Sequence, residues 1–133
     1  MHATEDSTVI YGIGVDLIEI ERIAQAITRT GQRLIERLYT DAEQAYCRTH
    51  HPPYACYAAR FAAKEALLKA LGTGLRQHMR WRDIEVCRDH LGKPSLRLYN
   101  YLHERCAAAG IRHIHLSLSH SETCAIAQVI LEC

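Results

Sequence analysis

The strongest structural signal in the chain is a long segment rich in alanine and leucine, residues 54–71. Its apolar side chains recur at helical spacing, which predicts a helix with one stripe that faces a core. The residues of this stripe are Ala63, Ala66, Leu67, Ala70 and Leu71. A glycine at position 72 predicts the end of the helix. We therefore expect the rest of the fold to pack around this helix.

Shorter patterns predict the other elements. Strand patterns occupy residues 9–15, 83–88, 95–99, 112–119 and 123–131. The first strand contains two glycines, which suggest that another backbone approaches it closely. Helical patterns occupy a segment after Asp16, residues 40–48 behind a capping box of Thr40 and Glu43, and residues 100–109. This order predicts an α+β fold in which the long helix packs on an antiparallel sheet.

The remaining global properties restrict the class of protein. Residues 1–8 are expected to form a flexible leader and residues 9–133 a single domain. Sixteen basic and fifteen acidic residues leave a net charge of +1, so we expect neither nucleic acid nor a membrane surface as a partner. No apolar run approaches the ~20 residues that cross a bilayer. The six cysteines are scattered without a C-x-x-C pair, which predicts reduced, buried thiols in a cytoplasmic protein.

Asp16 is the first residue with a possible role in chemistry. Asp16 and Glu19 have the spacing of a helix cap, a feature worth about 1 kcal/mol. A carboxylate that follows a strand beside glycines can instead bind a hard cation. Taken alone, the residues favour the cap.

Glu65 and Lys69 lie four residues apart on the long helix, on the side predicted to be opposite its apolar stripe. A solvated Glu–Lys pair worth about 0.2–0.5 kcal/mol is the ordinary interpretation. The alternative is that Glu65 binds a metal while Arg60, Lys64 and Lys69 face phosphates. Mg²⁺ takes one or two protein carboxylates together with phosphate oxygens and water, so these residues could form such a site.

Residues 113–120 alternate between apolar side chains on one face and histidines and serines on the other. The polar row is either a solvent-facing sheet surface or part of a site. A zinc site made by His113, His115, His120 and Cys124 is a further alternative. We disfavour zinc because the cysteines lack the pairing that is typical of zinc sites.

Taken together and in this order, the motifs resemble one family, the holo-[acyl carrier protein] synthases, which are the small bacterial type of 4′-phosphopantetheinyl transferase. The resemblance runs from about Val9 to Leu131, nearly the whole chain. Its blocks are IYGIGVDL (10–17) with Arg22, RFAAKEA (60–66), KALGTG (69–74), DIEV (83–86), GKP (92–94) and HLSLSH (115–120). The combination of the first block with RFAAKEA is highly specific.

The resemblance implies an Mg²⁺-dependent enzyme of fatty acid biosynthesis. The enzyme would transfer 4′-phosphopantetheine from coenzyme A to a serine of apo acyl carrier protein and release 3′,5′-ADP. The resemblance also implies that Asp16 and Glu65 hold the Mg²⁺ and that Lys69 lies near the phosphate under attack. The acceptor of the serine proton stays open between Glu65, a metal-bound water and His115.

The same resemblance implies the binding sites for the two substrates. Residues expected near coenzyme A are Arg60, Lys64, Gly92, Lys93, Pro94, Ser119 and His120. Arg22, Arg29 and Arg33 are expected to bind the acidic carrier protein, although Gly31 interrupts the helix that carries them. A homotrimer with active sites between its subunits is also expected.

Two alternative functions stay open. One is the same chemistry on a carrier domain of a polyketide or peptide synthase. The other is a non-catalytic module that binds a carrier protein. The joint presence of Asp16, Glu65 and Lys69 argues against the module, because a protein that only binds a carrier has no need of a metal site.

Overall fold

The computed structural model describes residues 9–133, so the leader predicted at residues 1–8 lies outside the described residues. The elements follow in this order: β1 Ile10–Glu19, α1 Ile20–Thr30, α2 Gln32–Leu38, α3 Asp41–Cys47, α4 Tyr54–Leu71, the 3-10 helix η2 Trp81–Asp83, β2 Ile84–Arg88, β3 Pro94–Leu98, α5 Asn100–Ala108, β4 His113–His120 and β5 Cys124–Glu132. Both sheets are antiparallel. The α+β class predicted from the sequence is therefore confirmed.

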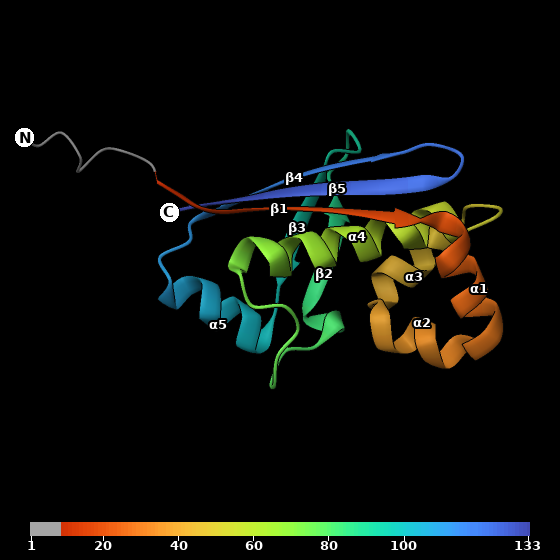
Figure 1. Cartoon of the computed structure of the whole chain (residues 1–133), viewed down its shortest axis with the longest axis horizontal. Helices are drawn as coiled ribbons and strands as arrows, with labels where there is room; N and C mark the ends of the chain where they lie inside the picture. Colours follow the sequence, from red (N-terminus) through yellow and green to blue (C-terminus); the bar gives the residue numbers. More distant parts are fainter. Residues whose placement is uncertain (1–8) are drawn as a thin grey trace, which may run out of the picture.

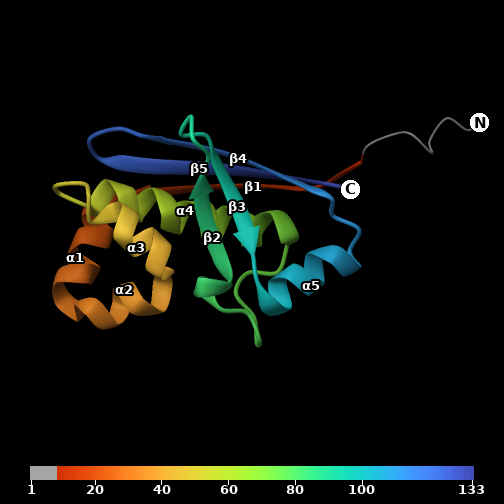
Figure 2. The ribbon, with the colours of Figure 1, turned by 180° about the vertical axis from the view of Figure 1, so that it is seen from behind.

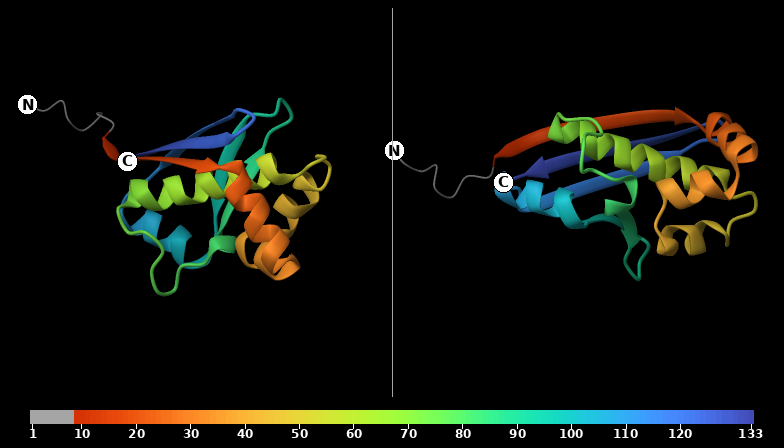
Figure 3. Two further views of the ribbon diagram at one scale, coloured as in Figure 1. Left: turned by 45° about the vertical axis from the view of Figure 1, so that its right-hand side comes forward. Right: turned by 90° about the horizontal axis from the view of Figure 1, so that it is seen from below.

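The long helix α4 lies between the main sheet and the smaller elements. β1, β5 and β4 form a three-stranded sheet in that order, and β2 pairs with β3 in a separate hairpin. α4 runs lengthwise along the three-stranded sheet, with α1, α2 and α3 gathered at one end and α5 at the other (Figures 1 and 2). Figure 3 shows from below that α4 runs alongside β1.

Two glycines allow the strand β1 to touch the helix α4. A Cβ added to Gly12 would clash with the carbonyl of Ala70, and one added to Gly14 would clash with the carbonyl of Ala66. Only glycine leaves room for this contact, as the glycines of the strand predicted. The contact sets how far α4 lies from β1 and which side of the helix faces the strand.

Apolar side chains form two buried groups on either side of this contact. The first combines the predicted stripe of α4 with the inner faces of β4 and β5 and with Leu102 of α5. Ile114, Leu116 and Leu118 pack against it, which confirms the predicted alternation along β4. The second group, around Tyr39 and Tyr57, joins α1, α2 and α3 to the first half of α4.

The local signals at helix ends are partly confirmed. α3 begins with the predicted capping box of Thr40 and Glu43, and α4 ends at Gly72 in the left-handed conformation. The helix after β1 breaks at Gly31, whose φ is 78°, so it becomes α1 and α2.

The prediction that Asp16 ends the first strand and caps a helix is wrong. β1 continues to Glu19 because it pairs with β5 along this length, and Asp16 lies opposite Ala127. Glu19 is the residue that precedes α1, and it forms no side-chain cap. Asp16 is thus an inner position of a paired strand.

The expectation that all the cysteines are reduced thiols is also wrong. Cys47, at the end of α3, forms a disulfide with Cys56, in the first turn of α4. The other four cysteines, Cys87, Cys106, Cys124 and Cys133, are free.

Within residues 9–133, no helix is long and apolar enough to cross a membrane.

The contact between β1 and α4 predicts that one methyl group added at Gly14 strongly lowers the stability of the fold. Gly14→Ala should lower the free energy of unfolding by about 3 kcal/mol, because the methyl overlaps the backbone of α4. Urea unfolding measures this change. Gly72→Ala is the control, since it meets no neighbour within 4 Å and has only the left-handed backbone to strain, at about 1 kcal/mol. Equal losses in the two variants would contradict the close contact.

Candidate functional site

A pocket of about 470 Å³ opens between β1, the helices α1 and α2, and α4. Two acidic side chains, Asp16 and Glu65, lie in its wall, and we call it the carboxylate pocket. Arg22 and Arg37 supply positive charge at the same pocket. Much of the remaining wall is apolar and includes Ile18, Ile23, Phe61 and Trp81. The pocket therefore combines a polar end with an apolar surface.

The two carboxylates are close enough to influence each other. Partial burial raises the pKa of Glu65, and the negative charge of Asp16 raises it further, while Lys69 lowers it. Lys69 Nζ donates hydrogen bonds to Asp16 Oδ1 at 3.0 Å and to the carbonyl oxygen of Val15 at 3.1 Å. The sequence had suggested a pair between Glu65 and Lys69, whereas the lysine binds the strand carboxylate.

This pair of carboxylates fits a hard divalent cation. The mutual repulsion that raises the pKa of Glu65 would be relieved by a cation between the two groups. Mg²⁺ takes one or two protein carboxylates and fills its other positions with phosphate oxygens and water. Among the residues that the structure describes, no group of three or more His, Cys, Asp or Glu is arranged to hold a metal. Within residues 9–133, the residues of the zinc alternative, His113, His115, His120 and Cys124, do not form such a group.

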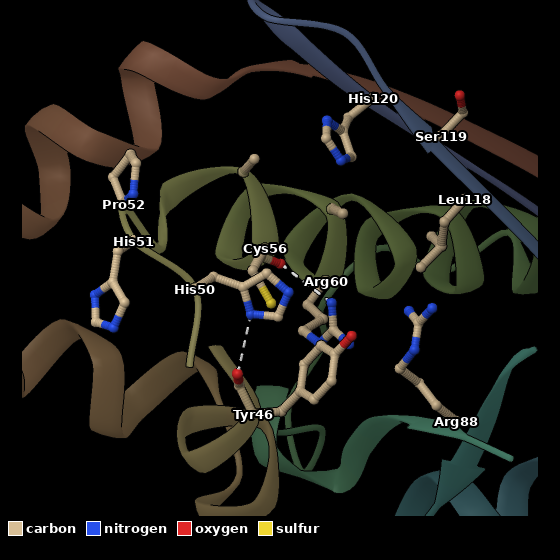
Figure 4. Close-up of a pocket in the computed structure, with 12 residues that line it drawn as sticks. Tyr46, His50, His51, Pro52, Cys56, Arg60, Arg88, Leu118, Ser119 and His120 are labelled. Carbon is tan, nitrogen blue, oxygen red and sulfur yellow. Dashed lines mark hydrogen bonds between the residues drawn. The ribbon is translucent and has the colours of Figure 1, made fainter. Parts of the chain in front are cut away.

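A second pocket of about 460 Å³ lies on the other side of the first turns of α4. Arg60 and Arg88 line it together with Tyr46, and we call it the arginine pocket. The guanidinium carbon of Arg60 lies 4.5 Å from the centre of the Tyr46 ring, and that of Arg88 lies 5.4 Å from it. Ser119 and His120, at the end of β4, lie across the pocket from the tyrosine (Figure 4).

The buried guanidinium of Arg60 makes this pocket a candidate site for an anion. Arg60 Nη1 donates a long hydrogen bond of 3.5 Å to the Cys56 carbonyl, while Nε has no hydrogen-bond partner. Burial lowers the pKa of Arg60, and the positive charge of Arg88 lowers it further, against opposing effects of Tyr46 and Glu43. A buried donor without a partner beside a second cation is best satisfied by an anionic ligand.

Two other predicted parts of the site lie outside both the carboxylate pocket and the arginine pocket. They are the turn at residues 92–94 and His115. Lys93, Pro94 and His115 line a third pocket of about 340 Å³, between the hairpin turn and β4. His115 Nε2 is 3.0 Å from Glu132 Oε1 on the neighbouring strand. His115 therefore does not line the carboxylate pocket of its own chain.

The prediction that Lys64 faces phosphates is wrong. Lys64 is fully buried, and its Nζ donates to Glu43 Oε1 at 2.7 Å, to the Leu38 carbonyl at 2.7 Å and to the Trp81 carbonyl at 3.2 Å. Burial lowers the pKa of Lys64, and Glu43 opposes this effect. The cause is the second apolar group, which covers a side of α4 that the sequence pattern left exposed.

The arginines that line the two pockets are only partly those expected from the sequence. Arg22 lies at the carboxylate pocket, while Arg29 and Arg33 are exposed and line neither this pocket, nor the arginine pocket, nor the pocket at His115. Arg37, Arg88 and Tyr46 were missed. Arg37 follows Arg33 by one helical turn, so its spacing was a usable signal. Nothing local marks Arg88 or Tyr46, because only the tertiary fold brings them to Arg60.

Known proteins resemble this chain in sequence and in fold. Residues 12–127 match the model of the 4′-phosphopantetheinyl transferase superfamily. The chain is 47% identical over 124 residues to a holo-[acyl-carrier-protein] synthase of Geobacter sp. (strain M21), covering 93% of this chain and 99% of that protein. The crystal structure of a holo-[acyl-carrier-protein] synthase from Neisseria meningitidis is similar with a TM-score of 0.86 and 36% identity, over 92% of this chain and 98% of that one.

A third similar protein is described with a ligand. It is a holo-(acyl-carrier-protein) synthase from Bacillus anthracis str. Ames in complex with CoA (3′,5′-ADP). Its TM-score is 0.76 and its identity 38%, over 92% of this chain and 96% of that one.

The environment of Lys64 predicts a structural role for this lysine. Lys64→Met should lower the free energy of unfolding by about 3–5 kcal/mol, because Glu43 is left buried without its cation. Urea unfolding measures the loss. Lys93→Met is the matched control at an exposed lysine and should change stability by less than about 0.5 kcal/mol. A Lys64→Met protein as stable as the control would show that the ion pair is not needed.

Proposed function

The chain belongs to the 4′-phosphopantetheinyl transferase superfamily, and from this membership we propose that it transfers 4′-phosphopantetheine from coenzyme A to a serine of apo acyl carrier protein, releasing 3′,5′-ADP. The observation that carries the proposal is the meeting of Asp16 and Glu65 beside Lys69 in one pocket. Relatives named holo-[acyl-carrier-protein] synthase, one of them described with CoA (3′,5′-ADP), support the choice of substrates.

In the proposed reaction the serine oxygen attacks the β-phosphorus of coenzyme A, and the bond to 3′,5′-ADP breaks. Mg²⁺ held by Asp16 and Glu65 would neutralise charge on the pyrophosphate. Lys69 Nζ, which is within hydrogen-bond distance of Asp16, can donate to a phosphate oxygen at the same place. Of the two protein groups considered as proton acceptors, only Glu65 lies in this pocket.

We assign the nucleotide end of coenzyme A to the arginine pocket. Arg60 supplies a buried cation with an unsatisfied donor, and Ser119 and His120 supply polar groups across from it. Phosphate groups are among the anions that guanidinium groups bind through two parallel hydrogen bonds. Lys93 and the turn that carries it are proposed as further nucleotide contacts, supported by the family resemblance alone.

The carrier protein is proposed to dock at the carboxylate pocket. Arg22 and Arg37 lie at this pocket beside apolar wall residues. Such a surface suits an acidic partner that also offers apolar side chains next to its serine. Arg29 and Arg33, exposed nearby along α1 and α2, would add attraction at longer range.

We also propose, from the resemblance, that the reaction serves fatty acid biosynthesis in the cytoplasm.

A homotrimer would cover the outer face of the three-stranded sheet. Ile13, Val15 and Leu17 of β1 are 59%, 50% and 64% exposed, and Ile126 of β5, which pairs with Leu17, is 40% exposed. Contiguous apolar surface of this kind usually marks an interface. We propose that subunits pack through this face, and that His115 and the turn at residues 92–94 approach the carboxylate pocket of the neighbouring subunit.

The transfer reaction is tested by intact-mass spectrometry of an apo acyl carrier protein incubated with the protein, coenzyme A and Mg²⁺. We expect the carrier to gain one phosphopantetheine, about 340 Da, and to gain nothing when EDTA removes the metal. Asp16→Asn and Glu65→Gln should lower the rate at least about 100-fold while the protein stays folded. Glu104→Gln, at an exposed position on α5, is the control and should keep full activity. Normal transfer by either site variant would contradict the proposed metal site.

The trimer is tested by light scattering. The wild-type mass should be about three times the 15.1 kDa of one chain. Ile13→Lys should shift the mass toward that of one chain, because it places a charge within the proposed interface. Leu75→Lys is the control, since Leu75 is 43% exposed in the segment after α4 and belongs neither to the three-stranded sheet nor to the turn at residues 92–94. A wild-type mass of one chain in active protein would contradict the trimer.

A further inference from the structure

The disulfide between Cys47 and Cys56 is part of the frame of the arginine pocket. Cys56 lines the pocket, and the loop between the two cysteines contributes His50, His51 and Pro52 to the same wall (Figure 4). Cys47 directly follows Tyr46, and Cys56 lies one helical turn before Arg60. The bond therefore joins the element that carries the aromatic ring to the element that carries the buried guanidinium stacked on it.

Little else holds this loop to the body of the protein. The hydrogen bonds of Thr49 and His50 run back to Tyr46 and Cys47 at the end of α3. Residues 48–52 are exposed. The start of α3 has a separate attachment, because Glu43 forms the buried ion pair with α4. Opening the disulfide would thus remove the covalent link between the end of α3 and α4. The loop would then be held only through the packing of Tyr46 and Cys47, while the domain stays folded.

Of the two cysteines, Cys56 is the one at the pocket. Cys47 is fully buried, whereas Cys56 is 8% exposed and is one of the residues that line the pocket. These positions offer a reductant an approach to Cys56 through the arginine pocket. A ligand that fills the pocket would block this approach.

We propose that Cys47 and Cys56 form a reversible redox site that controls how tightly the arginine pocket binds the nucleotide phosphate of coenzyme A. The inference rests on the proposed function for the identity of the ligand. In the oxidised protein the disulfide holds Tyr46 and the loop in place, so the pocket is formed before the ligand arrives. In the reduced protein, binding must also order Tyr46 and the loop. The entropic cost of this ordering lowers the affinity for the nucleotide. Disulfides in reducing compartments are usually catalytic or redox-sensing.

The chemistry is thiol–disulfide exchange with a dithiol. A thiolate of the reductant attacks Cys56 Sγ, the S–S bond breaks, and Cys47 leaves as a thiolate that takes a proton from water. The second thiolate of the reductant then displaces Cys56 and closes the reductant's own disulfide. The protein gains the two electrons that the dithiol loses. Reoxidation is the reverse exchange with a small-molecule disulfide such as oxidised glutathione.

The test measures binding of 3′,5′-ADP by calorimetry to the full chain in its oxidised form and again in excess dithiothreitol. This probe contains the nucleotide phosphates but no thiol, so it cannot exchange with the disulfide. We expect Kd to rise about three- to tenfold on reduction, as the loss of preorganisation predicts. Alkylation followed by mass spectrometry verifies that two additional thiols have appeared.

Variants separate this pair from the other cysteines. The double variant C47A/C56A should show the weaker Kd with and without dithiothreitol, and Cys124→Ala, at one of the free thiols, should keep the wild-type dependence on reduction. By linkage, saturating 3′,5′-ADP should shift the equilibrium between the wild-type disulfide and the dithiol toward the disulfide by the same factor, as measured in a buffer of reduced and oxidised dithiothreitol.

The outcomes distinguish this inference from the proposed function. An unchanged or lower Kd in verified reduced protein overturns the redox site, even if transfer to the carrier protein is normal. A protein that neither binds 3′,5′-ADP nor transfers phosphopantetheine in either redox state overturns the proposed function and the inference with it.

Discussion

The contact between β1 and α4 determines where everything else in this protein lies. Gly12, Gly14 and Asp16 alternate along β1 and therefore share the face that meets the helix. The two glycines let the strand rest on the backbone of α4 at two alanines that are one helical turn apart. The next position on the same face is Asp16, which meets Lys69 and faces the charge of Glu65. A packing contact and a candidate metal site are consecutive parts of one interface.

A second consequence is that α4 is surrounded on most sides, so residues next to each other in its sequence occupy different environments. Arg60 lies in the arginine pocket, Lys64 forms a buried ion pair with α3, and Glu65 lies in the carboxylate pocket. The helix separates the two pockets and forms a wall of each. In the proposed complex, the nucleotide of coenzyme A lies in the arginine pocket and its pyrophosphate lies near the carboxylate pocket. A single coenzyme A would have to cross α4 to reach both pockets of one chain, or it would use the two pockets of neighbouring subunits. The proposed trimer would supply that second arrangement.

Much of the fold could be predicted because its signals are local. Periodicity located α4 and the alternating strands, and the capping box located the start of α3. The pairing of Asp16 with Glu65 came from resemblance to a family, since each residue alone favoured an ordinary structural role. The burial of Lys64 could not be predicted, because it depends on the packing of α1, α2 and α3 against α4. The disulfide and the position of Arg88 beside Tyr46 likewise depend on tertiary contacts that leave no mark in spacing.

The contact between β1 and α4 brings Asp16 and Glu65 into one pocket, where we propose that they bind one divalent cation. The most direct measurement is anomalous diffraction from crystals grown with Mn²⁺ and coenzyme A, with Mn²⁺ standing in for Mg²⁺. We expect one anomalous peak in direct contact with both carboxylates and with a phosphate oxygen of coenzyme A. A peak bound at another site, or one that touches neither carboxylate while coenzyme A is bound, would contradict the proposed metal site.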